Sequence, residues 1–132
     1  PTRPGRLPED VTRALAILEA RDELDGVIAC SKPTFNPFWV GVVEKDGHIA
    51  PAMGNGRYER RQDVPTFMRI NGSLYLWRRA FVARAVPWLD GVQAALEIPE
   101  ARAFSIDDLY EFQVAEAFLA RGLISFPWLV KQ

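Results

Sequence analysis

The sequence predicts an α/β protein in which helices pack on a mixed, mostly parallel sheet. Residues 8–21 repeat apolar side chains at the spacing of a helix, and residues 107–121 do so again. Residues 27–30 form a short run that is entirely apolar, which is typical of a strand covered on both faces. Residues 73–77 alternate along the chain in the manner of a half-buried strand. Helices that alternate with strands in this way indicate the α/β class.

Both helices have recognisable ends. Residues 8–10, Pro-Glu-Asp, place a proline and two acids in the first turn, where they suit the helix geometry and dipole. For the second helix, Ser105 is the expected N-cap, Asp107 and Asp108 lie in the first turn, and Gly122 ends it.

The remaining elements are shorter, and turn residues separate them. We expect a loop at 31–37, a strand at 38–43 that returns as a hairpin at 48–50, and a loop at 51–58. Further along, we expect a short helix at 79–88 and a strand at 94–98. The apolar tail at 124–130 is expected to pack against another surface, such as that of a second subunit.

Composition limits the classes of function. A chain of 132 residues is expected to form a single domain, residues 1–132. Its net charge of −1 gives no reason to expect a nucleic acid partner, and no apolar run approaches the roughly 20 residues of a membrane span. The lone Cys30 cannot form an internal disulfide, which favours the reducing cytoplasm.

The stretch from residue 60 to 77, RRQDVPTFMRINGSLYLW, carries the clearest chemical signal. Arg61 and Arg69 precede an alternating strand, with Asn71-Gly72 at the bend. Guanidinium groups held beside a buried strand suit the binding of an anion. The alternative interpretation is an ordinary loop that enters a strand, with solvated arginines.

This stretch resembles the middle of the acylneuraminate cytidylyltransferases, the CMP-sialic acid synthetases, in its order R-Q-D-x-P, x-R-x-N-G and a strand with a central tyrosine. Three more segments are similar in the same order. They are PTRPGRLPEDV at the start, Asn36-Pro37-Phe38-Trp39, and Ser105-Ile106-Asp107-Asp108 with the helix after it. The family shows P-T-S-P-L-R where this chain has PTRPGR.

The resemblance implies a set of site residues. Arg61 and Arg69 would hold the anionic groups of the sugar acid and the phosphate, while Asn36, Asn71 and Tyr75 would contact the sugar. The chain also allows simpler roles, because Tyr75 fits a partly buried strand and Asn36 fits a turn before proline.

The resemblance also implies Mg²⁺, held by Asp107 and Asp108. Two acids at this place also suit a helix start. The family has Asp-Ile-Asp, whereas this chain has Ser105 in place of the first acid, and a hydroxyl is a much weaker ligand than a carboxylate. Trp39 stands where the family often has a lysine that reaches across a dimer.

The implied fold is part of a doubly wound sheet of the nucleotidyltransferase type, lacking the N-terminal nucleotide-binding strands. The implied reaction transfers CMP from CTP to a sialic-type sugar acid, in a homodimer, and we expect this chain alone to be a partial enzyme. One alternative is a related acceptor, such as another eight- or nine-carbon sugar acid. Another is a non-catalytic remnant or self-associating interaction domain of the same fold.

Overall fold

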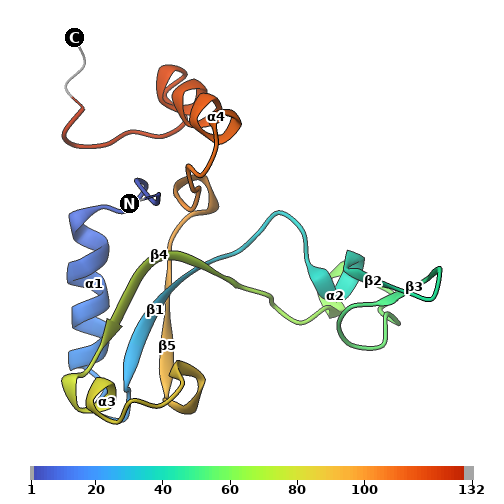
Figure 1. The fold of residues 1–132 in the computed structure, drawn as a ribbon, viewed down its shortest axis with the longest axis horizontal. Coiled ribbons are helices and arrows are strands. Elements are labelled where there is room, and N and C mark those ends of the chain that lie inside the picture. Colours follow the sequence, from blue (N-terminus) through green and yellow to red (C-terminus); the bar gives the residue numbers. More distant parts are fainter. Residues whose placement is uncertain (1, 130–132) are drawn as a thin grey trace. The chain divides into compact units, whose positions relative to one another are not determined.

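The structure, a computed structural model, describes residues 2–129. Helices alternate with strands, which confirms the α/β class, and parallel and antiparallel strand pairs both occur. The chain forms two compact units: unit 1 comprises residues 1–31 and 70–132, and unit 2 comprises residues 32–69. The helices and strands, drawn in Figure 1, are α1 (Pro8–Glu19), β1 (Gly26–Ser31), α2 (Pro37–Val40), β2 (Val42–Lys45), β3 (His48–Pro51), β4 (Arg69–Trp77), α3 (Arg79–Ala83), β5 (Gln93–Glu97) and α4 (Leu109–Ala120).

Unit 1 contains a sheet with the strand order β4-β1-β5. β1 and β5 are parallel, with Gly26 opposite Gln93 and Cys30 opposite Glu97. At one end of β4, Asn71 Nδ2 donates to Ser31 Oγ over 2.8 Å; past its other end, the backbone N–H of Arg78 donates to Asp25 O over 2.9 Å. β4 therefore runs antiparallel to β1. The sheet is mixed, as predicted, but among the described strands its parallel part is limited to the β1–β5 pair, so it is not mostly parallel.

Helix α1 covers one face of this sheet, packed on β1 and β5. The predicted helix at 8–21 is confirmed, although α1 ends at Glu19. Of its predicted apolar face, Ala14 and Leu18 are buried while Val11 and Leu15 stay exposed. The core of the unit consists of Ala14, Leu18, Leu24, Val27, Ala29, Leu74, Leu96 and Ile98.

In strand β4, the regular alternation of side chains between the two faces of the sheet is interrupted at Gly72. Asn71 bonds Ser31, which lies on the same face of β1 as the core residues Val27 and Ala29, yet Leu74 also belongs to that core. Residues an odd number apart share a face only if the strand is irregular between them. Gly72 supplies the irregularity with a φ of 75°, a value that a residue with a side chain rarely adopts.

Unit 2 consists of α2, the β2–β3 hairpin and the loops around them. The hairpin is confirmed, with Lys45 opposite His48, but the strand predicted at 38–43 is wrong over its first half. Residues 37–40 form a short helix because Pro37 occupies its first turn and the Asn36 side chain accepts a hydrogen bond from Phe38 N.

The C-terminal elements also differ from the prediction in their bounds. The helix expected at 79–88 ends at Ala83. Ala85 has a φ of 51°, a left-handed conformation that is incompatible with a right-handed helix. Strand β5 confirms the strand expected at 94–98. In the apolar tail Ile124 and Phe126 are buried, and Val130 lies outside the described residues. Among the described residues, every helix is too short or too polar to cross a membrane.

Candidate functional site

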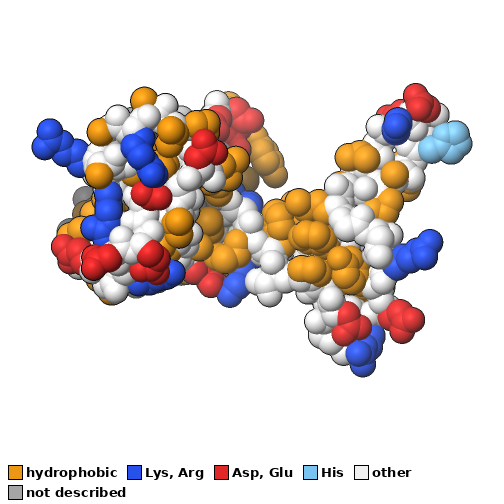
Figure 2. Space-filling view, turned by 90° about the horizontal axis from the view of Figure 1, so that it is seen from below, with side chains coloured by type: hydrophobic (Ala, Val, Ile, Leu, Met, Phe, Trp, Pro, Cys, Tyr) orange, Lys and Arg blue, Asp and Glu red, His pale blue; other side chains and the backbone are white. Residues whose placement is uncertain are grey.

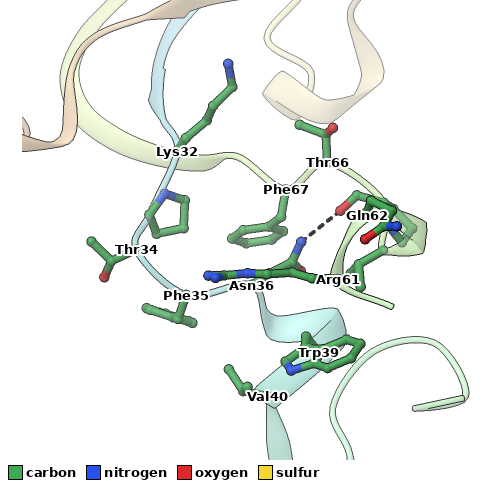
Figure 3. Close-up of a pocket in the computed structure, with 13 residues that line it drawn as sticks. Lys32, Thr34, Phe35, Asn36, Trp39, Val40, Arg61, Gln62, Thr66 and Phe67 are labelled. Carbon is green, nitrogen blue, oxygen red and sulfur yellow. Dashed lines mark hydrogen bonds between the residues drawn. The ribbon is translucent and has the colours of Figure 1, made fainter. Parts of the chain in front are cut away.

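Unit 2 contains a cavity of about 610 Å³, a size typical of small-molecule sites. Two segments form it, residues 32–40 and residues 61–67. Figure 3 shows their side chains around the cavity, with Arg61 extended across it and the rings of Phe35, Phe67 and Trp39 arranged around that arginine. The cavity therefore combines a guanidinium with aromatic walls.

Asn36 holds the two walls of this cavity together. Its Oδ1 accepts from Phe38 N over 3.0 Å, which caps α2, and its Nδ2 donates to Pro65 O over 2.8 Å on the opposite segment. The second bond is the dashed line in Figure 3. Because both polar groups of the amide are used within the chain, Asn36 shapes the cavity in this structure.

Arg61 and its neighbour Arg60 have different surroundings. Arg60 is exposed and forms a two-pronged ion pair with Asp63, its Nε and Nη2 lying 3.1 and 3.2 Å from the carboxylate oxygens. Arg61 begins the short 3-10 helix Arg61–Asp63 and lines the cavity. Arg60 is therefore part of a surface ion pair, and the cation that this pair of arginines offers to the cavity is Arg61.

The cavity also has walls that sequence reasoning missed. Lys32 adds a second cationic side chain, and Gln62 adds an amide between Arg61 and the turn at residues 63–65. Phe35 and Phe67 supply aromatic faces. The available signal was the recurrence of aromatic residues near polar ones in both segments, which is typical of a site that binds a ring with polar substituents.

The other predicted substrate residues lie on β4. Arg69 begins the strand and is half-buried. Asn71 is 1% exposed, its Nδ2 donates to Ser31 Oγ, and its Oδ1 accepts from Ser73 N over 2.9 Å. Tyr75 is exposed and stacks on Trp77 at 5.4 Å between ring centroids, on the face away from the core residue Leu74. Asn71 and Tyr75 therefore lie on opposite faces of the sheet.

Asp107 and Asp108 form the start of α4. Asp108 is the N-cap, and its Oδ1 accepts from Glu111 N over 2.8 Å, while Glu111 Oε2 accepts from Asp107 N over 2.7 Å. Asp108 therefore caps α4, and the expected cap at Ser105 is wrong. An N-cap side chain accepts from an amide two or three residues further on, and Asp108 has the longer spacing to Glu111.

The fit of this segment to a magnesium ion is partial. Over residues 2–129, no group of three His, Cys, Asp or Glu side chains is placed to hold a metal. Magnesium in proteins often uses only one or two carboxylates and takes its other ligands from substrate phosphates and water. Asp107, exposed at the helix start, suits such a role only together with oxygens from a substrate.

Comparison with known proteins finds a distant similarity. The chain is 23% identical over 113 residues to the post-translational flagellin modification protein B of Campylobacter coli. The match covers 86% of this chain and 47% of that protein, so the chain spans about half the length of the relative. The chain matches none of the known protein-family profiles.

Proposed function

We propose that this chain is the acceptor-side part of a nucleotidyltransferase that moves CMP from CTP to a sialic-type sugar acid and releases pyrophosphate. The observation that carries the proposal is the unit 2 cavity, which joins Arg61 to aromatic and amide side chains. A sugar acid presents a carboxylate, which a guanidinium binds well, and a ring with polar edges and apolar faces.

The residues take distinct roles in this proposal. Arg61 binds the carboxylate, and Lys32 raises the positive potential of the cavity. Asn36 keeps the cavity open by joining its walls. Arg69 holds a phosphate group, and Asn71 positions β4 from inside the sheet of unit 1. Asp107, next to the cap Asp108, would hold Mg²⁺ together with oxygens of the substrate, and the ion would supply positive charge for the leaving pyrophosphate.

The similarity to a flagellin modification protein supports the proposal coarsely. Attachment of a sugar to a protein requires an activated donor, such as a CMP-sugar, so a role in protein modification is consistent with this reaction. The complete reaction would belong to a longer protein, since the relative is about twice as long as the matched part. A cytoplasmic location also belongs to the proposal, because the partly buried Cys30 is a free thiol.

The proposed test uses a matched pair of neighbouring arginines. We expect N-acetylneuraminate to bind the chain in isothermal titration calorimetry and Arg61→Ala to weaken binding by about tenfold, because a charge-assisted hydrogen bond is lost. Arg60→Ala, which removes the same charge outside the cavity, is expected to leave binding unchanged. If both variants weaken binding equally, the cause would be the net charge of the chain, and this result would count against a site at Arg61.

The second candidate function is a non-catalytic, self-associating domain of the same fold. The observation in its favour is the β2–β3 hairpin, where every residue is exposed. Figure 2 shows orange hydrophobic side chains open to view along this unit, with charged side chains beside His48, in pale blue. A chain that self-associates and binds no sugar acid would support this candidate. The proposed enzyme also includes a homodimer, so self-association alone does not separate the two.

A further inference from the structure

The side chain of Arg3 lies flat over Gly72, where β4 changes its alternation. A Cβ atom built on Gly72 would be 3.3 Å from Nε, 3.5 Å from Cζ and 3.6 Å from Nη2 of Arg3. Such similar distances to three atoms of one plane mean that the guanidinium presents its face to the glycine. Its N–H donors lie in that plane and therefore point sideways, away from Gly72.

Two hydrogen bonds, one between backbone groups and one from a side chain, hold the N-terminal segment at this position. The carbonyl of Thr2 accepts from Ile106 N over 2.8 Å, which joins the segment to the residues just before α4. Arg6 Nη1 donates to Ser73 O over 3.2 Å, so a second guanidinium contacts the residue after Gly72. Two cations from the N-terminal segment thus meet consecutive residues of β4.

Arg3 differs from the other partly buried arginines of unit 1 in its partners. Arg102 pairs with Asp10, and Arg78 donates to the carbonyls of Leu24 and Leu18. Arg3 is half-buried as well, but within residues 2–129 it has no hydrogen bond and no carboxylate within ion-pair distance. A cation that is partly removed from water without a counter-charge is unfavourable, and a bound anion would correct this.

We propose that Arg3, with Arg6 beside it, binds an oxyanion at the Gly72 bend of β4. The guanidinium edge of Arg3 supplies paired donors suited to a phosphate or a carboxylate. Gly72 is part of the site, because a side chain there would crowd the guanidinium and would strain a backbone with a φ of 75°. The choice of ligand rests on the proposed function, which offers two sources of this chemistry: the phosphates of the nucleotide and the carboxylate of the sugar acid.

The guanidinium of Arg3 is the group that the proposed site depends on. Arg3→Ser removes it and leaves a small polar side chain on the same backbone.

The test measures binding of two probes to the chain by calorimetry, in about 150 mM salt to screen weak surface attraction. The probes are inorganic pyrophosphate and N-acetylneuraminate, without added metal. We expect at least one to bind, Arg3→Ser to weaken that binding about tenfold or more, and Arg3→Lys to restore part of it. Arg79→Ser, which removes an exposed arginine of α3, is the matched control and is expected to change nothing.

Each outcome has a defined meaning. If Arg3→Ser weakens the binding of pyrophosphate more, the site is a phosphate site. If it weakens the binding of N-acetylneuraminate more, the site is a carboxylate site. Binding of neither probe, or equal weakening by Arg3→Ser and Arg79→Ser, overturns the proposal. A longer protein that fails to release pyrophosphate from CTP would refute the proposed function, while binding that depends on Arg3 would still stand.

Discussion

Arg102 and Asp10 form a two-pronged ion pair inside unit 1. The Nη1 atom of Arg102 lies 2.6 Å from Asp10 Oδ2, and Nη2 lies 3.1 Å from Oδ1, with the side chains only 14% and 2% exposed. The same Nη1 donates to Gly5 O over 3.0 Å. Gly5 is required there, because a Cβ atom on it would lie 1.9 Å from the carbonyl oxygen of Arg102. The pair therefore joins α1, the N-terminal segment and the residues after β5.

We expect Asp10→Asn to lower the free energy of unfolding by about 3 kcal/mol, because it leaves the buried Arg102 without its counter-charge. Urea unfolding followed by circular dichroism measures this change. Glu9→Gln is the matched control, since Glu9 is an exposed acid in the same helical turn, and we expect a change below about 0.5 kcal/mol. A similar loss in both variants would assign the effect to the helix dipole and contradict the role of the pair.

The pH dependence of this stabilisation follows from the pKa of Asp10. Burial acts to raise this pKa, but hydrogen bonds from Arg102 and the Leu7 N–H, with the charges of Arg102 and Arg13, lower it below the ordinary value of 3.8. A pKa that is lower in the folded state stabilises the fold above the unfolded value, and the contribution is lost as the pH falls through the folded value.

The stability difference between the wild type and Asp10→Asn is therefore expected to stay constant from about pH 7 to 5 and to shrink below about pH 4. Urea titrations at several pH values measure it. A difference of unchanged size at about pH 2 would show that the carboxylate charge is not its source.

Asn71 joins the three strands of unit 1 through a short chain of hydrogen bonds. Its amide donates to Ser31 Oγ over 2.8 Å, and Ser31 Oγ donates to Ile98 O over 2.6 Å. We expect Asn71→Ala to lower the free energy of unfolding by about 2 kcal/mol, because buried polar groups lose their partners. Tyr75→Phe, which changes an exposed hydroxyl on the same strand, is expected to have little effect.

A double-mutant cycle tests whether these residues act together. Ser31→Ala breaks the same chain of hydrogen bonds, so its effect and that of Asn71→Ala are expected to be non-additive by about 0.5 kcal/mol or more. Additive effects would mean that the two residues stabilise the sheet independently.

Local patterns were enough to predict most of unit 1. The apolar spacing of residues 8–21 and the apolar run at 27–30 depend on neighbours in the sequence, and they correctly predicted α1 and β1. The strand expected at 38–43 failed because aromatic residues favour strands, whereas the cap at Asn36 and the proline after it started a helix.

The candidate site was harder to predict because an amide has the same chemistry wherever it lies. The resemblance placed Asn36 and Asn71 beside a sugar, but their hydrogen-bond partners, Pro65 and Ser31, are 29 and 40 residues away in the sequence. Only the folded chain shows that both amides hold segments together. For the same reason the local pattern around Arg3 predicts no partner for it, since Gly72 lies beside it only in the folded chain.

The β2–β3 hairpin is expected to form the contact between two copies of the chain. Val42, Val43 and Ile49 are 49–74% exposed, and a two-stranded hairpin alone is only marginally stable in water. We expect sedimentation velocity to show a dimer and Ile49→Asp to shift it toward monomer, because a charge would be buried in an apolar contact. Val82→Asp, at an exposed position of α3 in unit 1, is the control and is expected to remain dimeric. A wild-type chain that stays monomeric at about 100 μM, or a dimer that both variants weaken equally, would show that the hairpin is not the interface.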